Sequence, residues 1–351
     1  FPNWRSGNQG LKIHFTPGER FSYSGEGYVY LAAAVERITG ETLASLVART
    51  VFAPLGMTSS SFVWQERYLR LKVHNHNLLG QVDGRRMPWR ANAAASLHTT
   101  AADYARFVAA VVGGRGLRAS TLAQMLTPQS RLDERGFNTA TAQPSGSVVP
   151  ALAWGLGWGL ERDGQVWSCW HWGDNGSTKA YVVASPSRRD GLVVFLNSEN
   201  GLTIAPALVS EFLGRPSAAF AWLRQQEFVP AMGRFVRTAR ERSVTEALAE
   251  YRSGREPGAA VGALSEATVN RIGYALLRAR KVKDAVEVFR QNVADHPGSW
   301  NAHDSLGEGY AADGDVERAI QAYGRSLELN PANAGGAEAL RRLRQGAAPP
   351  R

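Results

Sequence analysis

The segment from residue 154 to residue 197 narrows the possible folds of this chain more than any other stretch. Two apolar, β-branched runs, 177–185 and 191–197, flank a short turn-forming segment, which predicts two neighbouring antiparallel strands. Before them, residues 171–173 read His-Trp-Gly. We expect this triplet on a strand of the same sheet, where a glycine two places after a polar residue lets a ligand or another backbone come close. A lone strand histidine is more often structural, so the triplet alone defines no site.

Length and charge exclude several classes of protein. A chain of 351 residues can hold two domains and bury a substantial core. Its 44% hydrophobic and 20% charged residues are typical of a globular protein, and no apolar run approaches the length of a membrane-spanning helix. The formal charge of +9 comes from scattered arginines, which indicates a solvated surface and no nucleic-acid partner.

Metal and disulfide chemistry are not expected. Cys169 is the single cysteine, so the chain forms no internal disulfide and no cysteine-based metal site. Because Cys169 lies in an apolar run, we expect it to be a small buried side chain. No cluster of possible ligands has workable spacing, and the sequence therefore predicts no metal and no cofactor.

Three helices are predicted before the strands. Apolar residues recur at helical spacing between residues 29 and 38, and Gly40 can end this helix as a C-cap. A second helix is expected from about Thr42 to Val51. Residues 99–103 read as a third helix start, with a hydroxyl cap and an acid in the first turn, and the glycines at 113–114 stop it. Residues 128–150 show no periodicity, and we expect a polar loop there.

An internal repeat occupies the C-terminal part. Small, aromatic and proline residues recur 34 positions apart, the period of tetratricopeptide repeats, in the pairs Gly273/Gly307, Ala285/Ala319, Phe289/Tyr323 and Pro297/Pro331. In each unit the glycine lets two helices approach, and the aromatic ring fills the space between them. We expect repeats at 266–299 and 300–333 and a cap helix at 337–344. They are either a stabilising appendage or a groove for a protein partner.

These signals divide the chain into three parts. Residues 1–215 hold the predicted sheet, and the Gly-Arg-Pro at 214–216 marks the first boundary. Residues 216–262 are expected to be a helical linker, and residues 263–345 the two repeats with their cap helix. The predicted fold class is α+β, an antiparallel sheet with flanking helices, followed by an all-α segment.

Short motifs occur in a definite order along residues 1–215. They are Pro17-Gly18, Phe21-Ser22-Tyr23-Ser24, Gly27-Tyr28, Glu36, Thr39-Gly40, Pro54-Leu55-Gly56-Met57, Ser96-Leu97, Thr99 to Asp103, Gly155 to Gly159, and His171-Trp172-Gly173. Their order and spacing resemble those of the serine β-lactamase and penicillin-binding-protein superfamily. The class C-like branch, with its esterases, D-aminopeptidases and D-Ala-D-Ala carboxypeptidases, is the most similar. The resemblance implies a β-lactamase/transpeptidase-like fold.

The resemblance also implies a site built from three motifs. A Ser-x-x-Lys supplies the nucleophile and a lysine that helps to deprotonate it. A Tyr-x-Asn places a second proton-transfer group beside that serine. A Lys-Thr-Gly, often His-x-Gly in this branch, lies on the edge strand and meets the substrate acyl group and the oxyanion.

Carried over to this chain, Tyr23 matches the second motif as general base in acylation and proton donor to the leaving group. Because a phenol titrates near 10, the base role requires neighbouring positive charge to lower its pKa. His171 and Gly173 match the third motif, and His171 would orient or polarise the proton network. The backbone N–H of Asp174 is a candidate oxyanion donor, and Trp172 would line the substrate cleft.

Two departures from the family pattern bear on activity. Gly25 stands where the second motif has Asn, which removes one hydrogen bond to the substrate. No serine of the chain is followed by lysine three places later. In the family this motif lies well upstream of the tyrosine motif, and only 22 residues precede Tyr23. We therefore expect the nucleophile helix and the first strands to lie outside this chain, and the chain as given to be inactive.

Two functions stay open from the sequence. In the first, the full-length protein is a serine acyl-hydrolase that cleaves an ester, an amide or a D-amino-acid peptide through an acyl-enzyme. In the second, a degenerate hydrolase domain and the repeats form a non-catalytic module that binds a peptide or protein. Intact Tyr23, His171 and Gly173 favour the first, whereas Gly25 and the absent serine favour the second. By family analogy, the expected location is periplasmic or extracellular.

Overall fold

The computed structural model describes residues 13, 15–84, 87–137, 146–225, 227–254 and 264–345. The chain divides into two compact units. The first unit comprises Phe1–Asn75 and Asp83–Glu227, and the second comprises His76–Val82 and Phe228–Arg351. Each unit has its own hydrophobic core.

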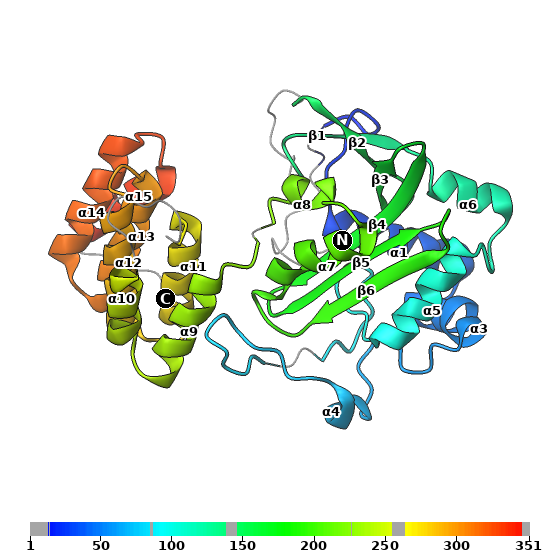
Figure 1. Ribbon diagram of the computed structural model, residues 1–351, viewed down its shortest axis with the longest axis horizontal. Coiled ribbons are helices and arrows are strands. Elements are labelled where there is room, and N and C mark those ends of the chain that lie inside the picture. The colour runs from blue at the N-terminus through cyan, green and yellow to red at the C-terminus, as the bar shows by residue number, and fades with distance from the viewer. Residues whose placement is uncertain are drawn as a thin grey trace. The chain divides into compact units, whose positions relative to one another are not determined.

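The first unit is built on a six-stranded antiparallel sheet in which every strand pairs with its neighbour in sequence (Figure 1). The strands are β1 (Ser130–Asp133), β2 (Val148–Trp154), β3 (Gly159–Asp163), β4 (Val166–Asn175), β5 (Thr178–Ser185) and β6 (Asp190–Leu196). The predicted pair of strands on either side of residues 186–189 is confirmed, and so is the place of the His-Trp-Gly triplet on a neighbouring strand.

The polar loop expected at 128–150 is wrong at both ends. Strand β1 begins at Ser130, and β2 already begins at Val148. In β1 only Leu132 is buried, so four residues of an edge strand gave too little alternation to be recognised. Residues 138–145, in the middle of the expected loop, lie outside the described residues.

The two faces of the sheet are covered by different helices. On one face Trp170, Tyr181 and Val183 pack with α7 (Ala205–Leu213) and α8 (Ala218–Trp222). On the other face Leu160, Cys169, Val182 and Ala184 pack with Val108 and Val111 of α5 (Ala101–Val112). Cys169 is buried, as its apolar neighbours predicted. The sheet is therefore the middle layer of three.

The first predicted helix is confirmed as α1 (Gly25–Thr39). The Ser24 side chain accepts from the N–H of Gly27, and Gly40 ends the helix with a φ of 72°, the left-handed conformation that glycine adopts at least cost. Beyond it lie α2, a π-helical turn, α3, α4, α6 and a 3-10 turn, at Leu43–Val47, Ala48–Phe52, Ala53–Leu55, Tyr68–Leu71, Ala119–Met125 and Gly201–Ile204.

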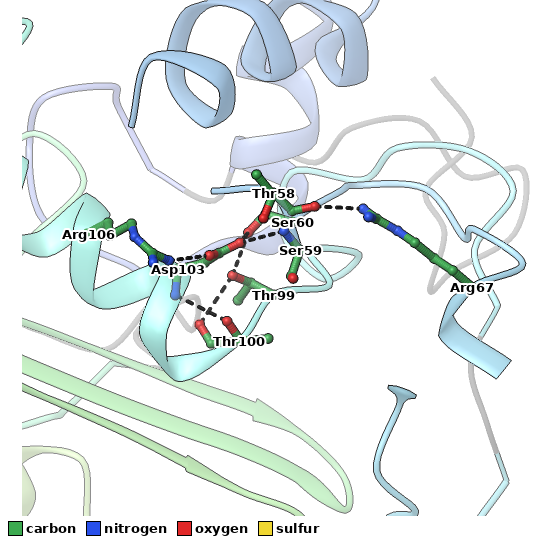
Figure 2. A network of polar contacts seen from close by, with 8 residues as sticks. All are labelled: Thr58, Ser59, Ser60, Arg67, Thr99, Thr100, Asp103 and Arg106. Carbon is green, nitrogen blue, oxygen red and sulfur yellow. Dashed lines mark hydrogen bonds and ion pairs between the residues drawn. The ribbon is translucent and has the colours of Figure 1, made fainter. Parts of the chain in front are cut away.

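The helix predicted to start at residues 99–103 is also confirmed, as α5, and its first acid has a further role. The Thr100 hydroxyl accepts from the N–H of Asp103 at 3.1 Å. The buried Asp103 carboxylate accepts from the Ser59 N–H at 2.8 Å and the Ser60 hydroxyl at 2.9 Å, and pairs with Arg106 at 2.7 Å (Figure 2). These bonds tie the loop after α3 to the start of α5, which explains the acid structurally.

The second unit is helical. Its helices are α9 (Pro230–Glu241), α10 (Val244–Ser253), α11 (Glu266–Arg278), α12 (Val282–Asp295), α13 (Trp300–Asp313), α14 (Val316–Leu329) and α15 (Ala334–Arg344). The pairs α11–α12 and α13–α14 begin 34 residues apart, as predicted. None of the helices in the described ranges is long and apolar enough to cross a membrane.

The glycine–aromatic packing predicted for each helix pair is confirmed. A Cβ atom added at Gly273 would lie 2.3 Å from the Phe289 ring, and one added at Gly307 would lie 3.0 Å from the Tyr323 ring. The first distance is too short for a side chain, and the second is tighter than most contacts of a Cβ atom. The close approach of the helices therefore requires Gly273, and at Gly307 a side chain would need the Tyr323 ring to shift by a small amount.

The division between the units differs from the boundary expected at residue 215. Phe220 and Trp222 lie in the core beside Trp170, so α8 belongs to the first unit. The remainder of the expected linker, α9 and α10, shares a core with α11 and α12. Its described helices are thus parts of two cores, because their apolar faces find partners on both sides of residue 227.

Candidate functional site

Strand β4 has two halves with different neighbours. From Val166 to Trp170 it pairs with β3 on one side, and from Cys169 onward it pairs with β5 on the other. Strand β3 begins at Gly159, opposite Trp170, so residues 171–175 pair with β5 alone in the part of the chain that the structure describes. We call this stretch, His171 to Asn175, the open edge of β4.

The backbone groups of the open edge have defined directions. Two-residue turns join β3 to β4 at Asp163/Val166 and β4 to β5 at Asn175/Thr178, and such turns close on a hydrogen-bonded pair. Because amide groups alternate along a strand, those of residues 171, 173 and 175 face β5. The N–H groups of Trp172 and Asp174 therefore face the open side. The Asp174 amide proposed from the sequence thus faces the side on which no described strand pairs with it.

His171 is held in one orientation by its own strand. Its Nδ1 lies 2.7 Å from the Trp172 carbonyl oxygen and must carry a hydrogen to bond there. Burial lowers the pKa of His171, with the Trp172 hydrogen bond opposing it. The neutral ring therefore leaves Nε2 as an acceptor, which is the form that a proton-transfer partner requires.

Tyr23 lies beside this histidine although 148 residues separate them in sequence. Its N–H donates to the Phe137 carbonyl at 3.0 Å. Its ring centroid is 4.6 Å from that of Trp172 and 5.9 Å from that of His171. The structure thus brings together three of the residues predicted from the sequence.

The pKa of Tyr23 does not move in the direction that a general base requires. A general base needs a lowered pKa, whereas burial raises the pKa of Tyr23 in this structure. The neighbours of its ring are aromatic, and aromatic surroundings disfavour a phenolate instead of stabilising it. With these neighbours Tyr23 is protonated at neutral pH, and its hydroxyl can donate a hydrogen bond.

Gly173 differs from a structural glycine on the neighbouring strand. A Cβ atom at Gly159 would lie 2.5 Å from the Trp170 ring, so packing requires that glycine. At Gly173 the nearest atom would be the Cβ of Ala180 at 3.4 Å, an ordinary contact. Packing against the described residues does not demand a glycine at 173, which favours the reading that it keeps the strand accessible.

The side chain of Asp174 is engaged at the turn. It forms an ion pair with Lys179, and its Oδ1 accepts from the Gly176 N–H at 3.2 Å. The Lys179 side chain is buried, although a lysine at the start of a hairpin strand is more often exposed. Asp174 therefore offers its backbone, not its carboxylate, to the open edge. Gly25 begins α1, two residues after Tyr23.

An aromatic wall surrounds the predicted residues. The Trp154 ring lies 5.5 Å from that of His171 and 6.2 Å from that of Tyr23, and the Phe137 ring lies 5.4 Å from that of Trp172. Sequence reasoning gave Phe137 no role because it lies in the expected polar loop, and no local pattern distinguishes it. Among the described residues no group of three or more His, Cys, Asp or Glu is placed to hold a metal ion. The site suits an apolar organic ligand with a hydrogen-bonding backbone.

Comparison with known proteins identifies the family of this chain. The family model described as Beta-lactamase matches residues 8–208, more than half of the chain. The chain belongs to the beta-lactamase family. Penicillin-binding protein 4* of Bacillus subtilis is 38% identical over 53 residues, which are 15% of this chain and 12% of that protein.

Solved structures with detectable similarity overlap the chain in part. The octameric penicillin-binding protein homologue from Pyrococcus abyssi is 20% identical with a TM-score of 0.49, over 63% of this chain and 48% of that one. The D-stereospecific amidohydrolase from Streptomyces sp. is 19% identical with a TM-score of 0.44, over 57% of each chain. This beta-lactamase-family chain therefore spans less than two thirds of the length of these relatives.

Proposed function

We propose that the first unit is the substrate-binding part of a serine hydrolase that acts through an acyl-enzyme on an ester, an amide or a D-amino-acid peptide. The observation that carries the proposal is the open edge of β4, where the rings of His171 and Trp172 lie beside that of Tyr23 and the Trp172 and Asp174 amides face away from β5. Membership of the beta-lactamase family supports it.

Each residue has a role that follows from its surroundings. An extended acyl substrate adds to the open edge as a strand does, with the Asp174 N–H available to its carbonyl oxygen as charge develops there. The neutral His171 ring accepts at Nε2 and so orients a hydroxyl proton. Tyr23, kept protonated by burial, donates to the leaving group in preference to serving as the base. The aromatic wall favours an apolar group next to the scissile bond.

The 351 residues contain no Ser-x-x-Lys, so a test of the proposal must look for the nucleophile in the protein that the whole reading frame encodes. The experiment reads the coding sequence upstream of Phe1, expresses the protein that the whole reading frame encodes, and treats it with a fluorescent penicillin and a fluorophosphonate. We expect an in-frame Ser-x-x-Lys and covalent label on its serine, with His171→Ala labelled on the order of a hundredfold more slowly. A reading frame without the motif, and no covalent label, would overturn the enzyme proposal.

A non-catalytic binding module is the second candidate. Gly25 in place of Asn and the raised pKa of Tyr23 favour it, because both remove functions that acylation uses. In this alternative the open edge binds an extended peptide that is not cleaved. The result that overturns the enzyme proposal supports this one, and retained binding of a D-Ala-D-Ala peptide without turnover would establish it.

For the second unit we propose two tetratricopeptide repeats, α11–α12 and α13–α14, capped by α15. The 34-residue offset and the Gly273/Phe289 and Gly307/Tyr323 contacts support the assignment. We further propose that the repeats bind a protein partner and that the protein acts in the periplasm or outside the cell. Protection of α11 and α13 from amide exchange by a captured partner would test the first of these two proposals.

A further inference from the structure

One short segment of the first unit's sequence belongs structurally to the second unit. The chain leaves the first unit after Asn75 and returns at Asp83. The tip residues Leu78 and Leu79 are 2% and 6% exposed, and they lie in the core of the helical unit with Met232, Phe235 and Ala239. We call residues 74–83 the connecting hairpin.

The tip of the connecting hairpin is an ordered turn. The Asn77 N–H donates to the Gln81 carbonyl at 2.9 Å, and the Asn77 Oδ1 accepts from the N–H groups of Leu79 and Gln81 at 3.0 Å. Gly80 supplies the left-handed residue of the turn with a φ of 73°. Because these amides are hydrogen-bonded and both leucines are buried, the tip is an ordered turn that is packed into the helical core.

The base of the same hairpin is bonded to the turn that ends β4. The buried Asn75 amide donates to the Thr178 hydroxyl at 2.7 Å, and the buried Ser177 hydroxyl donates to the Asp83 carboxylate at 2.5 Å. A third bond joins the Asn197 amide to the His74 carbonyl at 2.8 Å. The hairpin therefore bonds to the first residue of β5, to the turn before it and to the residue that follows β6.

That turn decides how firmly the open edge is held. Residues 176 and 177 join β4 to β5, and the Asp174–Lys179 ion pair spans them. Beyond Trp170, β4 has no bond to β3, so its end depends on β5 and on whatever fixes this turn. Strand ends with one neighbour open more readily than strands with two.

We propose that the connecting hairpin is a positioning element of the open edge, and that its order depends on the seating of Leu78 and Leu79 in the helical unit. The helical unit thereby acts on the site strand through residues 74–83, and a partner that loosens or tightens the α9–α10 core changes ligand binding at β4. The inference goes beyond the proposed function and holds whether or not the site is catalytic.

Amide hydrogen exchange on the 351-residue chain tests the proposal. In the double variant Leu78→Ala/Leu79→Ala we expect amides of residues 174–178 to exchange about tenfold faster, with β2 and β3 unchanged. Val82→Ala is the matched control, because Val82 lies in the same hairpin and is 63% exposed. It should leave the turn unchanged.

A second control separates this effect from general loosening of the helices. Leu343→Ala removes a buried side chain from a separate cluster at the far end of the helical unit and should leave the turn unchanged. Unchanged exchange at 174–178 in the leucine variant, or equal acceleration in Leu343→Ala, would overturn the proposal. If circular dichroism shows that the leucine variant has lost its helices, the bond between Asn75 and Thr178 at the base of the hairpin provides the test. Thr178→Val removes the acceptor and must speed exchange at the turn, whereas Thr178→Ser keeps the acceptor and must not.

Discussion

The two halves of β4 share one backbone but serve different purposes. From Val166 to Trp170 the strand pairs with β3, at Cys169 and Trp170 it pairs with β5 as well, and Ser168, Cys169 and Trp170 are buried. From His171 to Asn175 one neighbour is lost, and the side chains are half-buried or exposed. Pairing with β3 ends at Trp170, because Trp170 lies opposite Gly159, the first residue of β3.

The difference teaches where a sheet can carry function. A strand bonded on both sides has no free amide to offer, and its side chains are fixed by packing. The second half of β4 is held in register by β5, and among the described residues no strand pairs with its other edge. The predictions that follow compare the halves directly.

The largest expected difference concerns the two tryptophans of β4 on the same face. Trp170 is fully buried, so Trp170→Ala should lower the free energy of unfolding of the first unit by about 3–5 kcal/mol. Trp172→Ala should cost about half of that or less, because Trp172 is only partly buried. Urea unfolding followed by tryptophan fluorescence measures both, since nine of the ten tryptophans precede residue 228. Equal losses would remove the distinction between the halves.

The next effect concerns Gly159, which ends the paired half. A methyl group there meets the Trp170 ring at 2.5 Å, and the ring cannot move far within the core. We expect Gly159→Ala to cost about 1–3 kcal/mol in the same assay. Gly159→Ala combined with Trp170→Ala should cost less than the sum of the two, because the clash disappears with the ring. An additive double variant would contradict this account.

Much of this comparison could be read from the sequence, because it rests on local patterns. The strands around residues 186–189, the caps of α1 and α5 and the glycine–aromatic pairs of the helical unit follow from turn chemistry, capping and a fixed period. The meeting of Tyr23 with His171 followed from family motifs. No local signal joins two residues so far apart.

The features that sequence reasoning missed depend on tertiary partners. Strand β1 was missed because only Leu132 points inward. The base role considered for Tyr23 requires a lowered pKa, and burial raises it. Leu78 and Leu79 form an apolar pair in a polar stretch, and their partners begin about 150 residues later at Met232. No periodicity or spacing in the sequence predicts any of these three features.

A smaller effect, which arises in the second half of β4 at His171, concerns the pH dependence of the stability of the first unit. Burial lowers the pKa of His171, so the unfolded chain binds this proton at a higher pH than the folded chain does. The stability that comes from the neutral ring is complete above the ordinary value of about 6.5 and is lost as the pH falls below it. The first unit should therefore be less stable at pH 5 than at pH 7, and His171→Gln should reduce that difference. His303→Gln, in the helical unit, is the control; an unchanged pH dependence in His171→Gln would contradict the prediction.

The smallest effect on stability is expected at Gly173, and it is the sharpest test of the comparison. A methyl group at this position meets Ala180 at an ordinary distance, and the residue needs no left-handed conformation. Gly173→Ala should therefore change the free energy of unfolding by no more than about 0.5 kcal/mol, in contrast to Gly159→Ala on the neighbouring strand. If the open edge receives the substrate, the same methyl group displaces it and lowers acylation of the full-length enzyme on the order of ten- to a hundredfold.

The two glycines then give opposite results from the same chemical change. Loss of stability at Gly159 with unchanged labelling per folded molecule, and loss of labelling at Gly173 with unchanged stability, would assign packing to the first half of β4 and ligand access to the second. If Gly173→Ala destabilises the first unit as much as Gly159→Ala does, Gly173 is required by packing, and its absent side chain no longer indicates access for a ligand. If Gly173→Ala changes neither quantity, the open edge does not receive the substrate, and the role proposed for the Asp174 amide is contradicted.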